Sequence, residues 1–441
     1  MIQNREQLAV TPTHELVMDC IEQGIKATQP RNAVKNALTL TENTLEIQDR
    51  SIDLSPYSDI LILGGGKAAA QMARVLETII GDRLTDGIVV TNDPTETDQT
   101  RVIRGSHPVP NEVGRDGAAE ILSLAERAES DTLILFVLSG GGSSLLPLPT
   151  RDVSLSALRS LTQELLECGA SIDEINTVRK HLSQIKGGRL AVAAAPATVV
   201  GLVLSDVTGN DLGTIASGPI VGDSSTFADA KAVLERYDID APAPITAHLD
   251  EGELGKTPET PTPEDPVFET VHTHILADGS TAIRRAEAVA EASAFTPLIL
   301  STQVEGEART VGRVHAAIAN EAAATGRPVE PPLLLLSGGE TTVTICGDGV
   351  GGPNQEFVLD GLLATNTDEI VLGSVDTDGK DGVAAGAGAL ATREIIDDEE
   401  QAMAALADND AYSYLSERDA IIKTGPTGTN VNDLRIIAIP E

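Results

Sequence analysis

Apolar residues along the chain follow two alternating patterns, one typical of buried strands and one typical of amphipathic helices. Short continuous runs rich in Val, Ile and Leu predict strands. These runs occupy Asp59–Leu63, Gly87–Thr91, Thr132–Leu138 and Thr198–Leu204. Runs of this kind separated by helices are typical of a parallel sheet that is covered on both faces. We therefore expect an α/β fold.

The segments between these strands carry apolar residues at helical spacing. The predicted helices are Lys67–Ile80, Gly114–Ser130, Leu155–Cys168 and Ser171–Ile185. Ser171 and Glu174 have the spacing of a capping box, which predicts that the last of these helices begins there. The rhythm of strand, helix and strand indicates a Rossmann-like arrangement in this part of the chain.

One stretch, Asp250–Pro266, breaks the pattern. It reads DEGELGKTPETPTPEDP, which is acidic, rich in proline and free of apolar periodicity, so it predicts a linker or a surface excursion. A second α/β region follows, with strands predicted at Val271–Ala277, Thr296–Ser301, Pro331–Ser337, Glu369–Val375 and Ala420–Gly425. The expected domains are residues 1–249 and 267–441, joined by the linker 250–266.

Length and composition agree with this division. A chain of 441 residues exceeds what one hydrophobic core usually organises, and its hydrophobic content of 41% is enough for real cores. No apolar run reaches the length of a membrane span, and the first residues lack the pattern of a secretory signal. Three widely separated cysteines, Cys20, Cys168 and Cys346, fit a reducing cytoplasm better than a metal cluster.

The charge is strongly negative, with 67 acidic against 31 basic residues and a formal net charge of −36. Only nine of the basic residues are lysines, and aromatic residues make up 2% of the chain. Such a surface suits concentrated salt, where the Debye length falls to about 3 Å and self-repulsion is screened. We therefore expect a halophilic, cytoplasmic protein. Nucleic acid is an unexpected partner for a chain without a basic stripe.

Two apolar runs lead into serine and glycine, LSGGGSS at 138–144 and LSGGE at 336–340. A glycine turn at the end of a parallel strand can point several backbone N–H groups outward and form an anion cradle. The alternative is that the glycines only permit a tight turn. One such turn is a weak signal of phosphate binding. Two turns, one in each predicted domain, favour the interpretation that both domains contribute phosphate-binding residues. The candidates are Ser139, Gly140, Gly141, Gly142 and Ser143, and Gly338, Gly339 and Glu340.

A third glycine turn, GGGKAA, contains Lys67 and three further candidates for binding nucleotide or phosphate, Gly64, Gly65 and Gly66. It lacks the spacing of a phosphate-binding P-loop but matches a loose dinucleotide-binding pattern, G-x-G-x-x-A. A lysine in the first turn of a helix is disfavoured by about 0.3–1 kcal/mol, so Lys67 indicates an anionic ligand. The alternative is a lysine that extends along the surface to solvent.

The stretch INTVRKHLSQIKGGRLA concentrates four cations, Arg179, Lys180, Lys186 and Arg189. At helical spacing Asn176, Arg179 and Lys180 share a face, and we expect them to bind an anionic substrate. An internal salt-bridge cluster is the alternative.

Carboxylates follow two predicted strands. Asp206 ends the strand at 198–204 and is a candidate magnesium ligand or general base, whereas Asp211 can serve as a loop cap. Asp376, Asp378 and Asp381 follow the strand at 369–375, where a turn rich in aspartate is the alternative. The loop KTGPTGTNVND at 423–433 offers donors for phosphate, and His107 before a proline is interpreted as a structural turn residue.

Taken together, these blocks resemble a known family. GGGKAA, SHPVPN, LSGGGSSLL, INTVRKHLSQIKGGRLA, SDVTGNDLGTIASGP, LSGGETTVT, GGPNQE, DTDGKDG and TGPTGTNVND are similar, in this order, to the blocks of bacterial and archaeal glycerate 2-kinases with a C-terminal MOFRL domain. The resemblance spans Leu61–Asp433. It implies two α/β domains with the active site in the cleft between them, and transfer of the γ-phosphoryl group of ATP to D-glycerate with Mg²⁺.

The resemblance also implies roles for residues. Lys67 corresponds to the family's essential lysine and Asp378 to an aspartate of its second domain. The expected catalytic residues are Lys67, Asp206 and Asp378, the last two also metal ligands, and the expected substrate-binding residues are Ser139, Asn176, Arg179 and Lys180. Phosphate contacts are further expected from Asn354, Thr427 and Asn430. The block that usually reads GGRNQE has Pro353 in place of its arginine, so another guanidinium, Arg179 or Arg189, would have to supply that charge.

Two alternatives stay open at this point. The loose dinucleotide pattern is compatible with a hydroxypyruvate reductase that uses NADH or NADPH. The loss of the family arginine at Pro353 is compatible with a non-catalytic protein that binds nucleotide or metabolite. Formation of a homodimer is also left open by the sequence.

Overall fold

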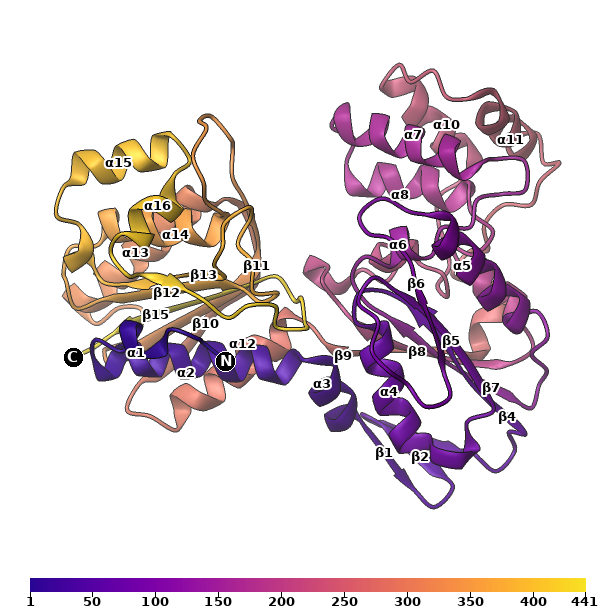
Figure 1. The fold of residues 1–441 in the computed structure, drawn as a ribbon, viewed down its shortest axis with the longest axis horizontal. Helices are drawn as coiled ribbons and strands as arrows, with labels where there is room; N and C mark the ends of the chain where they lie inside the picture. Colours follow the sequence, from indigo (N-terminus) through magenta and orange to yellow (C-terminus); the bar gives the residue numbers. More distant parts are fainter. The chain divides into compact units, whose positions relative to one another are not determined.

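The computed structural model describes all 441 residues, whose contacts divide them into two units (Figure 1). Residues 33–276 form one unit, here called the central unit. Residues 1–32 and 277–441 form the other, here called the terminal unit. The predicted position of the active site between the domains stays a prediction.

A six-stranded sheet with the order β6-β5-β4-β7-β8-β9 forms the core of the central unit. The pairs from β6 to β8 are parallel, which confirms the parallel sheet predicted from the apolar runs. Its strands are β4 (Asp59–Gly65), β5 (Asp86–Thr91), β6 (Arg101–Arg104), β7 (Thr132–Leu138), β8 (Thr198–Leu204) and β9 (Val271–Ala277). All seven residues of β7 are buried, because neighbouring strands and covering helices enclose it on every side.

Helices cover this sheet. Leu61, Leu63 and Val90 point to the face covered by α5 (Glu112–Ala125) and α9 (Arg189–Ala194), and α4 (Ala69–Ile80) also packs on the sheet. The short helix α6 (Gly142–Leu145) follows β7 directly. A small antiparallel sheet of β1 (Leu38–Thr41), β2 (Thr44–Ile47) and β3 (Arg50–Asp53) follows α3 (Pro30–Ala37).

Four helices, α7 (Leu155–Glu167), α8 (Ile172–His181), α10 (Phe227–Arg236) and α11 (Ala243–Glu253), share a separate hydrophobic cluster. The capping box predicted from Ser171 and Glu174 is present at the start of α8, so that prediction is confirmed. Short 3-10 turns complete the unit as η1 (Gly81–Arg83), η2 (Thr208–Asn210), η3 (Ile215–Ser217) and η4 (Pro266–Thr270).

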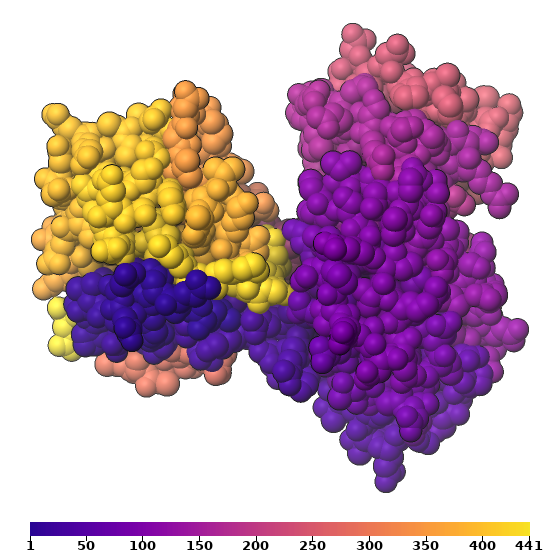
Figure 2. All heavy atoms as spheres, viewed as in Figure 1, coloured from indigo at the N-terminus to yellow at the C-terminus, as the bar shows by residue number.

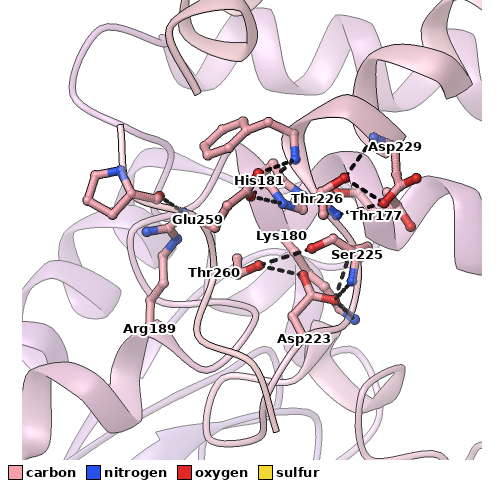
Figure 3. A network of polar contacts seen from close by, with 12 residues as sticks. Thr177, Lys180, His181, Arg189, Asp223, Ser225, Thr226, Asp229, Glu259 and Thr260 are labelled. Carbon is pink, nitrogen blue, oxygen red and sulfur yellow. Dashed lines mark hydrogen bonds and ion pairs between the residues drawn. The ribbon is translucent and has the colours of Figure 1, made fainter. Parts of the chain in front are cut away.

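The acidic segment 250–266 belongs to the central unit, so it does not separate the two units at the predicted boundary. Both carboxylate oxygens of Glu259 accept from Phe227 N at 3.1 Å, and Glu259 Oε2 also lies 3.2 Å from His181 Nε2. Thr260 donates to Asp223 Oδ2 at 3.1 Å (Figure 3). These polar contacts fix a segment whose composition alone gives no reason to pack.

The terminal unit contains a mixed six-stranded sheet with the order β10-β11-β15-β12-β13-β14. Only β10 and β11 pair in parallel, and the remaining pairs are antiparallel. The strands are β10 (Thr296–Glu307), β11 (Leu333–Thr342), β12 (Val371–Asp376), β13 (Gly388–Ala391), β14 (Ile421–Ile422) and β15 (Asp433–Ile439). The helices are α1 (Arg5–Leu8), α2 (Pro12–Thr28), α12 (Gly279–Glu291), α13 (Ala308–Thr325), α14 (Pro353–Ala364), α15 (Glu399–Ala407) and α16 (Ala411–Ser416), with the 3-10 turn η5 (Arg393–Ile395).

The N-terminal residues were expected to belong to the first domain, but α2 packs in the terminal unit. Val17, Met18 and Ile21 are fully buried in one cluster with Ile283 of α12 and Leu434 of β15. In Figure 2 the indigo N-terminal residues lie against the yellow C-terminal residues of this unit. The amphipathic pattern of α2 predicts a buried face but does not say which sheet buries it.

The second glycine turn predicted from LSGGE is not a turn. Gly338 and Gly339 lie inside β11, where they pair with Leu434 and Asp433 of β15. A β-carbon at Gly339, whose φ is 122°, would lie 2.3 Å from Val304 O of β10. These glycines therefore permit close packing of strands, and Glu340 continues the same strand.

Candidate active site

The turn that contains Lys67 is fixed by its own backbone hydrogen bonds. Gly66 N donates to Val90 O at 3.0 Å, Lys67 N to Gly140 O at 2.9 Å, and Ala68 N to Ser139 Oγ at 3.0 Å. These donors are therefore occupied and cannot cradle an anion as the sequence predicted for this turn. The arrangement instead holds the Lys67 side chain at the end of the sheet.

The glycines of the same turn have a packing explanation. Gly64 and Gly66 have φ values of 143° and 134°. A β-carbon at Gly64 would lie 2.0 Å from Val137 O, and one at Gly66 would lie 2.2 Å from Ser139 Oγ. Close packing against Val137 and Ser139 thus explains both glycines without a dinucleotide ligand.

The turn after β7 has free donors. The backbone N–H groups of Gly140, Gly141 and Ser143 make no hydrogen bond within the chain. Gly141 is in the left-handed region with φ 79° and begins the turn that leads into α6. Free N–H groups at the carboxyl end of a buried parallel strand are what an anion requires, so this turn is the stronger phosphate candidate.

Three titratable side chains surround this turn. Asp206 lies so close that a β-carbon at Gly140 would be 2.0 Å from its Oδ2. A β-carbon at Gly141 would be 2.8 Å from His107 Cδ2 and 3.3 Å from Lys67 Cγ. The structure therefore brings Lys67, Asp206 and His107 together around two glycines with free N–H groups.

The charges of these residues affect one another. Burial raises the pKa of Asp206, and the nearby positive charge of Lys67 acts in the opposite direction. Burial, with a smaller contribution from Lys67, lowers the pKa of His107 and so favours the neutral imidazole. A carboxylate with a raised pKa beside a lysine is an arrangement that can accept a proton from a hydroxyl group.

A chain of side-chain hydrogen bonds continues from the turn. Ser143 Oγ lies 2.8 Å from Ser217 Oγ, which donates to Asn176 Oδ1 at 2.9 Å. Ala216 and Ser217 have φ values of 52° and 60°, a strained conformation for residues other than glycine. Such strain clusters at functional sites, where the surrounding structure enforces it.

The four cations of the basic stretch have different partners. Lys180 Nζ forms an ion pair with Asp223 Oδ1 at 3.2 Å, so the side chain expected to bind substrate has an internal partner. Arg189 donates to Pro258 O at 3.3 Å, beside the segment drawn in Figure 3. Arg179 and Lys186 have no carboxylate partner. The ion pair of Lys180 fits the internal salt-bridge alternative. For Arg179 and Lys186 the anion-binding interpretation stays a prediction.

In the terminal unit, Asp376 and Asp378 lie at the carboxyl end of β12. Asp376 Oδ1 accepts from Asp378 N at 2.9 Å, and Asp378 Oδ1 accepts from Lys380 N at 2.7 Å, which are successive Asx turns. Burial, and then the charge of Asp378, raise the pKa of Asp376. A cavity of about 490 Å³ next to these turns is lined by Asp378, Lys380 and Lys423.

Several predicted phosphate ligands are occupied inside the fold. Asn354 is fully buried, donates through Nδ2 to Asp381 Oδ1 and Asp433 Oδ1, and accepts from Ser374. Thr427 donates through Oγ1 to Thr377 O at 2.6 Å. Neither side chain has a donor left for phosphate.

Other predicted residues also have structural partners. Asn430 Oδ1 accepts from Asn432 N at 3.0 Å, which shapes its own loop. Asp381 accepts from Asn354 N at 3.0 Å and Gln355 N at 2.9 Å and so caps the N-terminus of α14. Burial raises the pKa of Asp381 to about 7.

Pro353 occupies the first position of α14. Proline is favoured there because the first helical N–H has no partner within the helix and the φ angle of proline already fits. The substitution is thus compatible with the fold. The two arginines packed against α14 do not substitute for the missing charge, because Arg309 pairs with Glu356 and Arg313 with Asp360.

No group of three or more His, Cys, Asp or Glu side chains converges to hold a metal ion. Magnesium in kinases commonly uses one or two carboxylates together with substrate phosphates. Asp376 and Asp378 are close enough for the charge of Asp378 to raise the pKa of Asp376, and this pair fits that kind of partial site. Asp206 fits it less well, because the charge of Lys67 already acts on it.

Sequence reasoning missed three residues of this site. His107 was interpreted as structural, although its position in the block SHPVPN was a signal. Lys186 was seen only as one of four cations, and Ser217 was not considered. Nothing in the local sequence indicates that Ser217 connects Ser143 to Asn176, since this depends on tertiary contacts.

No helix has the length and apolar character needed to cross a membrane.

Comparison with known proteins gives two family matches, a domain of unknown function (DUF4147) over residues 16–250 and the MOFRL family over residues 333–433. A glycerate 2-kinase of Pyrococcus horikoshii is 38% identical over 437 residues, covering 96% of this chain and 97% of the relative. A D-glycerate 2-kinase of Thermotoga maritima is 38% identical over 430 residues, with 96% and 97% covered. A crystal structure of a glycerate kinase from Thermotoga maritima superposes with a TM-score of 0.86 at 37% identity, covering 96% of this chain and 99% of that chain.

Proposed function

The chain belongs to the glycerate 2-kinase family with a C-terminal MOFRL domain, and we propose that it transfers the γ-phosphoryl group of ATP to the 2-hydroxyl of D-glycerate. The observation that carries the proposal is the group formed by Lys67, Asp206 and the free N–H groups of Gly140 and Gly141. It provides a cation, a proton acceptor and anion-binding donors at one strand end.

Phosphoryl transfer needs little covalent chemistry from the protein. Positioning and neutralisation of charge supply most of the rate. Lys67 is proposed to stabilise the negative charge of the phosphoryl group as it passes to the acceptor. The N–H groups of Gly140, Gly141 and Ser143 would donate to phosphate oxygens, and their positions are set by the buried strand β7.

The acceptor hydroxyl must lose its proton. Asp206 is the proposed base, because its raised pKa matches this task better than an ordinary surface carboxylate. His107 lies beside the same turn, and its lowered pKa favours the neutral form, so it is proposed to orient the acceptor instead of adding charge.

Magnesium, when bound with the nucleotide, supplies charge neutralisation at the phosphates. Asp378, with Asp376 beside it, is the proposed protein ligand in the terminal unit. Lys380 and Lys423 line the same cavity and are proposed to meet nucleotide phosphates there.

Phosphorus NMR of the protein with Mg-ATP and D-glycerate in molar KCl tests the proposal directly. A signal of 2-phosphoglycerate is expected. A 3-phosphoglycerate signal would overturn the position of transfer, and hydrolysis of ATP without phosphoglycerate would overturn the acceptor. A parallel reaction with hydroxypyruvate and NADH should show no loss of absorbance at a catalytic rate.

We further propose that the protein is halophilic and cytoplasmic, because its acidic composition suits concentrated salt. With 67 carboxylates and 31 cations, the folded chain repels itself unless salt screens the charges.

A further inference from the structure

Lys186 is an unusual lysine in this chain. It is only 3% exposed, and its Nζ has a single hydrogen bond, to Ala216 O at 3.4 Å. An ammonium group has three protons to donate, so two of them have no acceptor in the protein. A buried ammonium without a carboxylate is costly, and most proteins avoid it.

A second cation lies beside it. Arg179 of α8 also has no carboxylate partner. Burial, and then the charge of Arg179, lower the pKa of Lys186 to about 7. In a chain where acidic residues outnumber basic residues by more than two to one, two adjacent cations without a carboxylate are unexpected. Lys180, one residue from Arg179, shows the ordinary arrangement through its ion pair with Asp223.

A third donor is unused. Asn176 Nδ2 is buried and has no hydrogen-bond partner. Its orientation is fixed, because Oδ1 accepts from Ser217 Oγ. Ser217 in turn contacts Ser143, which belongs to the turn with free N–H groups.

We propose that Arg179, Lys186 and Asn176 form the subsite that binds the carboxylate of the acceptor, a small 2-hydroxy acid. The inference rests on the proposed function and names the groups that recognise its substrate. A carboxylate can accept hydrogen bonds from both cations and from the amide. Its negative charge would also offset the repulsion between Arg179 and Lys186. The Ser217–Ser143 contact then connects this subsite to the phosphate-binding turn.

The subsite explains substrate selection. A neutral analogue such as glycerol or glyceramide would leave two cations desolvated and unpaired, which is strongly unfavourable. The acceptor is therefore expected to require a carboxylate next to the reacting hydroxyl. Binding energy at the carboxylate would hold that hydroxyl in place for transfer.

The variant Lys186→Met tests the proposal through two independent measurements. Methionine has a similar length and no charge, so the KM for D-glycerate should rise about 100-fold, while the KM for ATP should change less than about 2-fold. The melting temperature without substrate should rise, because an unsatisfied buried charge is removed. A purely structural lysine would instead give a lower melting temperature and an unchanged KM.

Matched variants complete the experiment. Lys231→Met is the control, since Lys231 pairs with Asp250 at 2.7 Å on a surface outside this site, and the KM values should stay at wild-type levels. Arg179→Gln should raise the KM for D-glycerate as Lys186→Met does. If the KM for ATP rises instead, the two cations bind nucleotide phosphate and the proposal is overturned.

The outcomes separate this inference from the proposed function. If the wild type phosphorylates D-glycerate and Lys186→Met has an unchanged KM, the subsite is wrong and the kinase activity stands. If the wild type has no kinase activity, the proposed function fails. Calorimetric titration of D-glycerate into wild type and Lys186→Met then tests the subsite separately. Binding to the wild type but not to Lys186→Met supports the subsite, and equal binding to both proteins overturns it.

Discussion

The carboxylate of Asp206 lies against the backbone of Gly140 with no room for a side chain between them. A β-carbon at residue 140 would lie 2.0 Å from Asp206 Oδ2. Gly140 does not have a positive φ, so glycine is required there for close approach and not for an unusual backbone conformation. The smallest residue thus determines where the proposed base is held.

Gly140→Ala is expected to displace the Asp206 carboxylate and lower kcat about 100-fold, within the range that a positioned base contributes. Circular dichroism melting should show a folded protein, because alanine accepts this backbone conformation. Asp206→Asn should give a loss of similar size. A Gly140→Ala variant with wild-type kcat, alongside an inactive Asp206→Asn, would contradict the positional role of Gly140.

Lys67→Ala is expected to lower kcat about 1000-fold, the upper range for loss of one group that stabilises transition-state charge. The fold should persist, since the turn is held by the backbone bonds of Lys67 N and Ala68 N. Steady-state kinetics with D-glycerate and ATP measure the effect. Retained turnover would remove Lys67 from the mechanism.

The pH dependence of kcat/KM for D-glycerate should report Lys186. Burial and Arg179 lower its pKa to about 7, so Lys186 is protonated below pH 7 and neutral above it. Carboxylate binding should therefore weaken above pH 7, and kcat/KM should approach about a tenfold fall per pH unit. In Lys186→Arg this fall should be absent, because arginine keeps its proton.

The same pKa affects stability in a defined window. Between pH 7 and the ordinary lysine value of 10.5, the unfolded chain binds a proton that the folded chain does not. The free energy of unfolding should thus rise with pH in this window from Lys186 alone. Urea denaturation at several pH values measures this dependence. The free energy of unfolding should increase less steeply with pH for Lys186→Met than for the wild type.

Asp381→Ala is expected to lower the free energy of unfolding by about 3 kcal/mol, because buried donors at the start of α14 lose their acceptor. The donors are Asn354 N, Asn354 Nδ2 and Gln355 N. Denaturation in urea measures the change. A loss below about 0.5 kcal/mol would show that Asp381 does not cap this helix, since N-cap removal alone typically costs more.

Salt should stabilise the protein. Screening of a net charge of −36 is expected to raise the melting temperature steadily as KCl increases to molar concentrations. Differential scanning calorimetry over a KCl series measures this. A melting temperature independent of KCl would contradict the halophilic interpretation.

Local patterns predicted the central sheet well. The apolar run Thr132–Leu138 is β7 and the run Thr198–Leu204 is β8, with the predicted bounds. The capping box at Ser171 was also predictable, because it depends on residues three positions apart. The family resemblance, carried by blocks across Leu61–Asp433, is confirmed by the comparisons.

Tertiary contacts account for what the sequence did not predict. Glycine after an apolar run indicates a turn, yet Gly339 is a strand residue that pairs with Asp433. Glycine is required there because Val304 approaches it closely. Asn354 has the chemistry of a phosphate ligand, but Asp381 and Asp433 use its amide. The isolation of Lys186 depends on which carboxylates are absent around it, and no local pattern contains that information.

The position of α2 has a practical consequence for dissecting this molecule. The polypeptide leaves the terminal unit after residue 32 and returns at residue 277, so the central unit is an insertion between two parts of one fold. A fragment that starts at residue 267 would expose the sheet surface that Val17, Met18 and Ile21 normally cover. Such a fragment should aggregate when produced alone and should regain solubility when a separate peptide of residues 1–32 is supplied.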